Sequence, residues 1–357
     1  MLSKRPVNMR VGICGYPGSG KSTVFSALVG GTAQAAKSGG VAFGSVKVPD
    51  ERIEYLSSVF DPKKKTYAEI TFVDVGGGSG GKAGAAFPPD VVQAMRNVDA
   101  IVHVARGFDN PMLSTPPDPK RDEQAFREEL VLMDLALMEK RVQRLTKEQK
   151  KGAELDASKR CLEHLEKGEP LRTLGLTEAE LAALGPGIQL LSLTPIVTLY
   201  NLSEAAWSDP ASAALRETRT EPGAAWLAMC GSIEGEIATL PPEEQKDFLE
   251  GLGIGEPARN VFVRTVYAML DLISFLTAGP DECRAWPIRR GTTARKAAGK
   301  VHSDIERGFI RAEIYRVDDL RAAAGSEATL KTQGKMRTEG KDYVMHDGDV
   351  VHYRFNV

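Results

Sequence analysis

A short glycine-rich segment near the start of the chain constrains its fold more than any other feature. Residues 15–23 read Gly-Tyr-Pro-Gly-Ser-Gly-Lys-Ser-Thr and match G-x-x-x-x-G-K-[ST] at every position. The apolar run Arg10–Cys14 precedes the motif, and a helical pattern over Lys21–Val29 follows it. Glycines in this arrangement let successive backbone N–H groups point at phosphate oxygens, at the positive end of the helix. The motif predicts an α/β domain with a phosphate-binding loop, and a tight turn that binds nothing is the alternative.

The residue types of the motif indicate how phosphates would be held. Lys21 is predicted to reach the β and γ phosphates and is the candidate catalytic residue, whereas the Ser22 hydroxyl is a predicted Mg²⁺ ligand. The predicted contacts of this loop come from Gly15, Tyr16, Pro17, Gly18, Ser19, Gly20, Lys21, Ser22 and Thr23.

A carboxylate at the end of a second apolar run is the other predicted Mg²⁺ ligand. The run Glu69–Asp74 ends on Asp74, from which a carboxylate would hold the ion through water. Asp74-Val-Gly-Gly77 fits D-x-x-G, so Gly77 would offer an N–H group to the γ-phosphate. An Asp that only caps a strand is the alternative. We expect the γ-phosphate to order residues 76–84 and hydrolysis to release them.

Further apolar runs indicate a mostly parallel sheet with helices on both faces. Residues 100–105 and 195–200 resemble the runs at 10–14 and 69–74, and helical stretches separate them. Continuous apolar strands are typical of sheets that are covered on both sides. After Asn201 the pattern predicts alternating helices and turns as far as residue 278.

Composition excludes several classes of protein. The chain has 357 residues, of which 42% are hydrophobic, enough for two or three domains, and a net charge of −2, which argues against a globally basic nucleic-acid binder. It contains no apolar run of 18 residues and no targeting segment, so a cytoplasmic protein without a membrane anchor is expected. The cysteines, which are far apart and predicted to be reduced, are Cys14, Cys161, Cys230 and Cys283.

Two amphipathic segments predict an inserted helical arm. Residues 123–151 carry apolar side chains at helical spacing in a charged background, and residues 153–167 continue the pattern after Gly152. Two helices joined this tightly predict an antiparallel hairpin, with a plain pair of surface helices as the alternative. Thr177 and Glu180 form a capping-box pattern at the start of another short helix.

The last 80 residues predict a separate α+β module. Residues 283–288 and 309–315 alternate like half-exposed strands, residues 293–304 favour a helix, and residues 347–355 favour a final strand. This order fits a small β-grasp-like domain. The segment from Gly279 onward holds 15 basic and 12 acidic residues. The basic residues that could contact RNA beside Trp286 are Arg289, Arg290, Arg295, Lys296 and Lys300.

The tetrad Asn201-Leu-Ser-Glu204 is the candidate for base recognition. It stands where GTPases carry N-K-x-D, whose Asp accepts two hydrogen bonds from guanine. Glu204 is one methylene longer than Asp, and Leu202 replaces the usual Lys, so guanine-specific geometry is not predicted. A helix N-cap is the competing interpretation of these four residues.

Taken together, these motifs resemble the YchF subfamily of Obg-related P-loop NTPases over nearly the whole length. The resemblance rests on the phosphate loop, the tetrad 201–204 and the segments 232–237, 284–286, 299–302, 308–313, 339–342 and 352–357. It implies a P-loop domain with a coiled-coil insertion and a C-terminal TGS domain, and an ATP-preferring, slow hydrolase read by ribosomes or translation-related RNA. It also implies that Asn201, Leu202, Glu204, Cys230, Gly231 and Ser232 belong to the nucleotide site.

Some positions depart from the family pattern. Family members usually carry, at position 18, an Asn associated with a potassium ion, and Gly18 stands there, which makes potassium dependence doubtful. After D-x-x-G the family carries a hydrophobic residue in place of the catalytic Gln that orients water in other GTPases, and Gly78 stands there in this chain. Without a water-positioning group or an arginine finger, which is worth about 10³ to 10⁵ in rate, we expect slow hydrolysis.

The sequence predicts a monomeric nucleotide switch in three parts. Residues 1–122 and 190–277 form the predicted P-loop domain, residues 123–189 the helical insertion and residues 278–357 the TGS-like domain. The predicted ligands are Mg²⁺ and ATP, or GTP in its place, and the predicted partner is the ribosome or RNA, contacted through the arm and the TGS-like domain. The alternatives are an interaction module with little hydrolysis and a GTP-specific switch.

Overall fold

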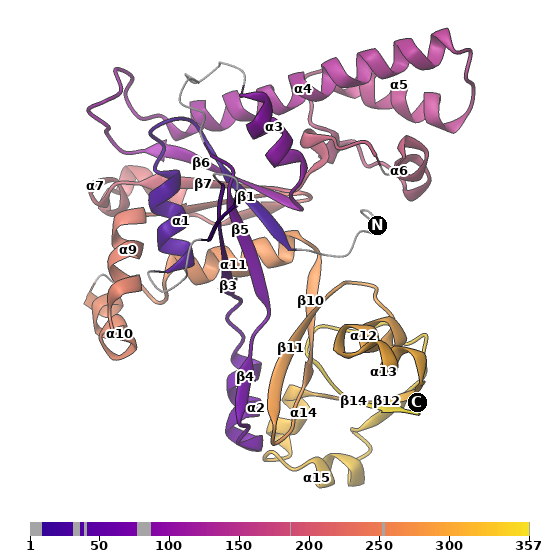
Figure 1. Ribbon diagram of the computed structural model, residues 1–357. Helices are drawn as coiled ribbons and strands as arrows, with labels where there is room; N and C mark the ends of the chain where they lie inside the picture. The colour runs from indigo at the N-terminus through magenta and orange to yellow at the C-terminus, as the bar shows by residue number, and fades with distance from the viewer. Residues whose placement is uncertain are drawn as a thin grey trace. The chain divides into compact units, whose positions relative to one another are not determined.

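The computed structural model describes residues 9–30, 36–38, 41–76, 87–185, 187–251 and 254–356. Contacts divide the chain into two compact units, residues 1–46 with 71–269, and residues 47–70 with 270–357 (Figure 1). The predicted boundaries place residues 47–70 with the nucleotide-binding domain. The structure instead joins them to the C-terminal unit, because β4 (Lys64–Thr66) pairs with β11 (Glu282–Arg289).

The first unit contains an eight-stranded sheet in the order β2-β3-β5-β1-β6-β7-β9-β8. Neighbouring strands from β5 to β9 run parallel, and β2 and β8 are antiparallel to β3 and β9. The strands are β1 (Arg10–Cys14), β2 (Ala36–Ser38), β3 (Val41–Lys47), β5 (Glu69–Asp74), β6 (Ala100–Gly107), β7 (Ile196–Leu202), β8 (Arg219–Glu221) and β9 (Ala224–Met229). The predicted α/β class and the four predicted strands are confirmed.

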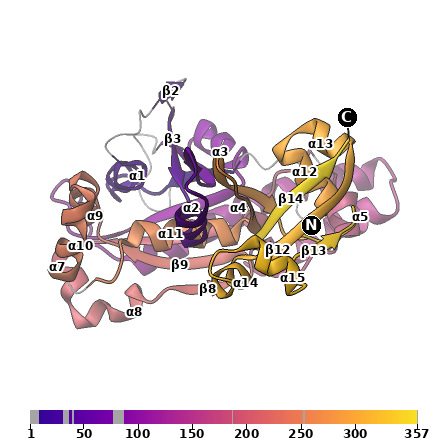
Figure 2. The same ribbon diagram turned by 90° about the horizontal axis from the view of Figure 1, so that it is seen from below.

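Helices cover both faces of this sheet (Figure 1). On one face, α3 (Pro89–Arg96) and the first half of α4 (Pro119–Lys147) pack on the core through Met95, Phe126 and Leu130. On the other face, α11 (Ala258–Met269) places Phe262 against Phe72 of β5. Helices α1 (Lys21–Val29) and α9 (Gly231–Thr239) lie side by side (Figures 1 and 2).

The prediction of only helices and turns after Asn201 was wrong. Strands β8 and β9 extend the sheet at this point, and short helices surround them. Strand β9 reads Ala-Ala-Trp-Leu-Ala-Met, and its alanines favour a helix by propensity. Burial between β7 and the sheet edge overrides that propensity, because all six residues are buried or half-buried. The helices are α7 (Glu204–Ser208), α8 (Ala213–Arg216) and α10 (Pro242–Gly251).

The helical hairpin is confirmed as an arm built from α4 and α5 (Ala153–Leu165). Its two helices contact each other through a buried seam that includes Met138, Cys161 and Leu165. Arg141 of α4 donates hydrogen bonds to the Ser158 hydroxyl and the Glu154 carboxylate of α5. The predicted capping box at the start of α6 (Glu178–Leu184) is also confirmed. None of the described helices combines the length and the apolar composition needed to cross a bilayer.

One buried carboxylate joins the arm to the sheet. Asp134 of α4 is 0% exposed and accepts hydrogen bonds from the backbone N–H groups of Leu191 and Ser192 and from the Ser192 hydroxyl, at 2.6–3.0 Å. Burial raises the pKa of Asp134, and the donated hydrogen bonds act in the opposite direction. These contacts hold the middle of α4 against the segment that leads into β7.

Replacing Asp134 by Ala is expected to destabilise the first unit. Three donors would lose their acceptor inside the protein, and the free energy of unfolding should fall by about 3 kcal/mol. Urea denaturation measures this loss, with Asp156→Ala on the exposed face of α5 as the control, for which a change within about 0.5 kcal/mol is expected. Equal losses in the two variants would contradict the assigned role.

The second unit contains a six-stranded mixed sheet in the order β13-β12-β14-β10-β11-β4. Its remaining strands are β10 (Leu272–Thr277), β12 (Phe309–Arg316), β13 (Arg337–Glu339) and β14 (Asp349–Phe355), and its helices are α2 (Glu51–Phe60), α12 (Ala294–Val301), α13 (Ser303–Arg307), α14 (Val317–Ala322) and α15 (Glu327–Thr332). The predicted α+β character is confirmed. The single helix predicted over residues 293–304 is two helices, because the chain is extended at His302, whose side chain caps the second.

Candidate functional site

The glycine-rich loop lies between β1 and α1, at the carboxyl end of the parallel strands. A Cβ atom at Gly15 would lie 2.5 Å from the Val104 carbonyl oxygen, so only glycine fits beside β6. Gly20 has a φ of 83°, and a Cβ atom there would collide with the Asn201 amide nitrogen. The loop is closed by a hydrogen bond from the Ser19 N–H to the Tyr16 carbonyl, 3.2 Å long. Sequence and packing therefore fix one compact backbone path.

Lys21 places a buried ammonium group inside this loop. Its side chain is only 9% exposed, and Nζ donates a 3.2 Å hydrogen bond to the Tyr16 carbonyl oxygen. Burial lowers the pKa of Lys21, and the neighbouring Cys14 and Asp74 act in the opposite direction. A cation that is withdrawn from water in this way gains strongly from an anionic ligand.

The loop fits a phosphate group and a magnesium ion. The Ser19 hydroxyl is buried and has no hydrogen-bond partner among the described residues. Asp74 lies opposite Ile13 in the pairing of β5 with β1, next to the start of the loop, and its carboxylate accepts a 3.1 Å hydrogen bond from the Gly76 N–H. Ser22, in the first turn of α1, is exposed. A hydroxyl and a carboxylate are oxygen ligands that Mg²⁺ prefers. The predicted site residue Gly77 lies outside the described residues.

Asn201 connects the phosphate loop to two other loops of the sheet. It lies at the end of β7 and is 4% exposed. Its side-chain amide donates a 3.1 Å hydrogen bond to the Ser19 carbonyl oxygen and accepts one of the same length from the Gly231 N–H. The structure therefore brings Asn201 and Gly231 to the loop, as predicted for the nucleotide site.

The neighbouring predicted residues divide into two groups. Ser232 donates a 3.1 Å hydrogen bond to the exposed Glu204 carboxylate, so these two lie together at the surface. Leu202 and Cys230 are each 3% exposed and pack in apolar clusters, so the structure does not bring their side chains to the phosphate loop. The competing N-cap interpretation is also correct in part, because the hydroxyl of Ser203 caps α7 through the Ala206 N–H.

A buried aromatic cluster lies behind the loop on the face covered by α4. Tyr16 stacks on Phe87 with ring centroids 5.7 Å apart, and His103 stacks on Phe126 at 4.1 Å. The Tyr16 hydroxyl donates a 3.2 Å hydrogen bond to Glu129 of α4. Burial raises the pKa of Glu129, and this hydrogen bond acts in the opposite direction. The loop is thus connected directly to the helix that forms the arm.

His103 lies in this cluster without the polar partners that a core histidine usually has. It is 0% exposed, and neither ring nitrogen has a hydrogen-bond partner among the described residues. Burial, with a smaller contribution from Lys21, lowers the pKa of His103 to about 3. From its place inside the apolar run 100–105, His103 is expected to be a core histidine with paired polar atoms. The core position is confirmed, and the expected pairing was wrong.

Replacing His103 by Phe is expected to remove part of the acid sensitivity of the fold. Because the pKa is depressed in the folded state, the unfolded chain binds the proton first, and stability present above about pH 6.5 is lost as the pH falls. Lowering the pH from 6.5 to 5 is expected to reduce the free energy of unfolding by about 2 kcal/mol because of this histidine. Hydrogen exchange of β6 amides at the two pH values measures the loss. Val102→Ala, a packing control in the same strand, should retain the full pH dependence, and an unchanged slope in His103→Phe would contradict the argument.

Sequence reasoning missed the loop that covers Gly18. Arg106 is 3% exposed and donates hydrogen bonds to the carbonyl oxygens of Phe108 and Thr115, at 3.2 and 2.7 Å. A Cβ atom at Gly18 would lie 2.7 Å from Leu113 and 2.9 Å from the Asn110 amide, so this loop leaves little room for a side chain at position 18. The signal available in the sequence was an arginine that directly follows an apolar strand.

Two family models match the sequence. MMR_HSR1, described as "50S ribosome-binding GTPase", matches residues 10–140, and YchF-GTPase_C, described as "Protein of unknown function (DUF933)", matches residues 272–356. Curated relatives named "Ribosome-binding ATPase YchF" match nearly the full length. The Bacillus subtilis protein is 38% identical and the Escherichia coli O157:H7 protein 35% identical, each over 98% of this chain and 100% of the relative.

Solved structures are similar in fold. The structure titled "Structure of the Schizosaccharomyces pombe YchF GTPase" matches with a TM-score of 0.84 and 30% identity, covering 98% of this chain and 99% of that one. A GTP-binding protein from Pyrococcus horikoshii matches with a TM-score of 0.57 at 18% identity, over 97% of this chain and 100% of that one, which concerns the fold alone. The P-loop fold predicted from residues 15–23 is thus confirmed.

Proposed function

Because this chain belongs to the YchF family, we propose that it is a switch that binds ATP with Mg²⁺, hydrolyses it slowly and associates with the ribosome. The observation that carries the proposal is the buried Lys21 ammonium, whose Nζ lies 3.2 Å from the Tyr16 carbonyl oxygen in a loop that requires glycine at positions 15 and 20. Curated relatives are named ribosome-binding ATPases, and a family model for a ribosome-binding GTPase matches the first unit.

Different groups in and around the loop hold the phosphates and the metal ion. Backbone N–H groups of the loop 15–23, except Pro17, which has none, and the Lys21 ammonium hold the phosphates. Ser22 and Asp74 hold Mg²⁺, which neutralises phosphate charge when bound. The Arg106 guanidinium donates to loop carbonyls and therefore does not serve as an arginine finger. Gly78 cannot orient water as Gln does, so hydrolysis is slow in the absence of an activator.

ATP is the proposed nucleotide. Asn201 uses its amide to connect Ser19 with Gly231, and Glu204 accepts a hydrogen bond from Ser232. The longer Glu204 side chain does not reproduce the short carboxylate with which GTPases read guanine. We expect ATP to bind more tightly than GTP to the unmodified chain.

Replacing Lys21 by Ala is expected to lower ATP affinity at least about 100-fold, because a desolvated charge–phosphate contact is worth about 3 kcal/mol or more. Isothermal titration calorimetry with ATP, GTP and their diphosphates measures this loss together with the nucleotide preference. Lys246→Ala is the matched control, because Lys246 is 80% exposed on α10. Unchanged ATP affinity in Lys21→Ala would refute the assignment of the site.

An interaction module that holds nucleotide and barely hydrolyses it is a second candidate, favoured by Gly78 in place of a catalytic Gln. Single-turnover assays with and without ribosomes distinguish the two. Phosphate release that ribosomes accelerate supports the switch, and no release under either condition supports the module.

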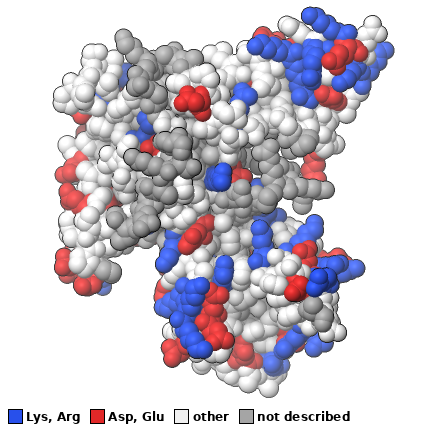
Figure 3. Space-filling view, viewed as in Figure 1, with Lys and Arg blue, Asp and Glu red and all other residues white. Residues whose placement is uncertain are grey.

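The far end of the arm is the proposed ribosome contact. Residues 139–160 hold eight Lys and Arg but only four Asp and Glu. Figure 3 shows these charges gathered at the end of α4 and α5. Arg144 and Lys147 are exposed on α4 and make no ion pair among the described residues. A cationic helix end of this kind suits the phosphate surface of ribosomal RNA.

Removing two charges from the arm by Arg144→Ala with Lys147→Ala is expected to weaken ribosome binding about tenfold at moderate salt and to reduce its salt dependence. Co-sedimentation with ribosomes over a salt series measures both quantities. Lys246→Ala with Arg264→Ala removes the same charge from α10 and α11 and serves as the control. An arm variant that co-sediments like the control would exclude this contact.

A further inference from the structure

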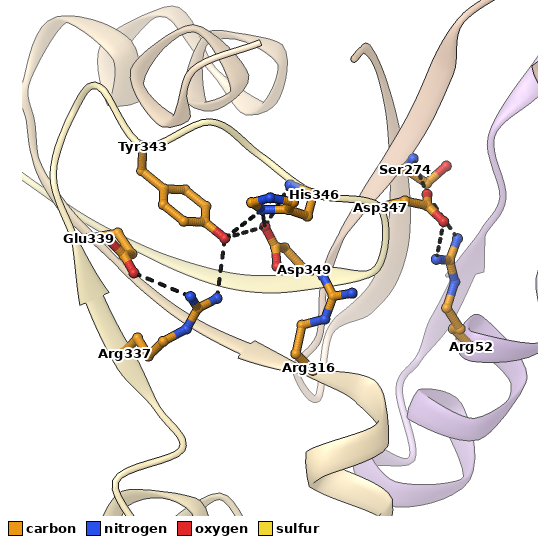
Figure 4. Close-up of polar contacts among 9 residues, drawn as sticks. All are labelled: Arg52, Ser274, Arg316, Arg337, Glu339, Tyr343, His346, Asp347 and Asp349. Atoms are coloured by element: carbon orange, nitrogen blue, oxygen red, sulfur yellow. Dashed lines mark hydrogen bonds and ion pairs between the residues drawn. The ribbon is translucent and has the colours of Figure 1, made fainter. Parts of the chain in front are cut away.

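The C-terminal unit contains an open polar pocket that the proposed function does not use. Its volume is about 400 Å³, and it is lined by Arg316, Asp319, Gly334, Lys335, Arg337 and His346. We call it the Arg316–Arg337 pocket; Figure 4 shows several of its side chains. It does not include the basic residues between 289 and 300 that the sequence suggested for RNA contact.

Strand pairing explains why the two arginines come together. Arg316 lies opposite Asp349 in the antiparallel pairing of β12 with β14, and Arg337 lies opposite Ile314 in the pairing of β12 with β13. Residues 314 and 316 are two apart in one strand, so their side chains point to the same face. Arg316 and Arg337 therefore reach the same side of the sheet from neighbouring strands.

A buried carboxylate fixes this arrangement. Asp349 is 0% exposed, and its two oxygens accept hydrogen bonds from Arg316 Nη1 at 3.1 Å, from the Tyr343 hydroxyl at 3.0 Å and from the His346 N–H at 2.8 Å (Figure 4). The Tyr343 oxygen in turn accepts from Arg337 Nη2 at 3.2 Å. Asp349 thus orders both arginines, one directly and one through Tyr343, and little side-chain entropy remains to be lost on binding.

The exposed side of the pocket presents cations. Arg316 and Arg337 are each 46% exposed, while the carboxylates that pair with them, Asp349 and Glu339, are 0% and 26% exposed. Asp349 engages only one nitrogen of the Arg316 guanidinium among the described residues. Asp319, the only carboxylate among the lining residues, pairs with Lys335 at 3.2 Å. The guanidinium groups consequently retain donors for an oxyanion, which arginine binds in a bidentate manner.

The lining also indicates what the pocket does not take. It includes no aliphatic side chain and no Phe, Tyr or Trp, so an acyl chain has no matching surface. A phosphate group of a nucleic-acid backbone suits an open pocket lined by cations, because the chain can continue out of the pocket on both sides of the phosphate. We propose that the Arg316–Arg337 pocket binds a backbone phosphate of RNA without regard to sequence. The choice of RNA as the source of the phosphate rests on the proposed ribosome association.

Fluorescence anisotropy with a labelled twelve-nucleotide oligouridylate, titrated with the full chain at several salt concentrations, tests the proposal. Arg316→Gln with Arg337→Gln removes both charges and leaves a polar amide at each position. Affinity should fall about tenfold at low salt, and the slope of log affinity against log salt should decrease by about 0.7, the value for one phosphate contact. The matched control is Arg311→Gln with Arg354→Gln, which removes two exposed charges paired with Glu313.

Lys335→Gln provides a variant that leaves the Asp349 hydrogen bonds intact, and it should weaken RNA binding about threefold with an unchanged melting temperature. Equal RNA affinity and salt slope in the pocket variants and the control would overturn the proposal. The proposal would also be overturned if the variants abolished binding of inorganic phosphate but left RNA binding unchanged. The pocket would then be assigned to a free anion. ATP affinity and ribosome co-sedimentation of the unmodified chain are measured in parallel, so a failure of the proposed function is seen separately.

Discussion

The side chain of Asn201 joins three loops at the carboxyl edge of the parallel sheet. It stands at the end of β7, donates to the loop after β1 through the Ser19 carbonyl, and accepts from the loop after β9 through the Gly231 N–H. Both bonds are buried, so breaking either would leave an unpaired backbone group away from water. Gly20 must lack a Cβ atom because this amide occupies the space beside it. The geometry of the phosphate loop therefore depends on a residue that lies 182 positions after Ser19 in the chain.

The phosphate loop is also connected to the arm. Tyr16 contacts Phe87 and the imidazole of His103 on one side and bonds to Glu129 of α4 on the other. Farther along the same helix, Asp134 is bonded to the segment that enters β7. A displacement of the loop would thus act on a helix that reaches the basic end of the arm. This is a contiguous set of packed and hydrogen-bonded groups of the kind that can carry coupling between two sites.

The sequence predicted the parts of the fold that depend on local pattern. The glycine motif, the apolar strands and the capping box at Thr177 are short-range signals, and the structure confirms the elements they predict. Strand β9 was missed because its alanines favour a helix until β7 pairs with it. The pairing of residues 64–66 with β11 was missed because no local signal connects segments more than 200 residues apart. Leu202 was placed in the nucleotide site from its position in a tetrad, while strand alternation sends its side chain into the core.

A net charge of −2 is compatible with two cationic sites because the carboxylates are placed differently from the amines and guanidinium groups. In the Arg316–Arg337 pocket, Asp349 is fully buried and uses both oxygens internally, so it orders the arginines while lying beneath them. At the end of the arm, cations simply outnumber carboxylates over one helical hairpin. The field that a polyanion meets depends on exposed charge within about one Debye length, which is about 8 Å at physiological salt. Summed charge is therefore a poor guide to the ligands of this chain, and the exposure of each charged group is the informative quantity.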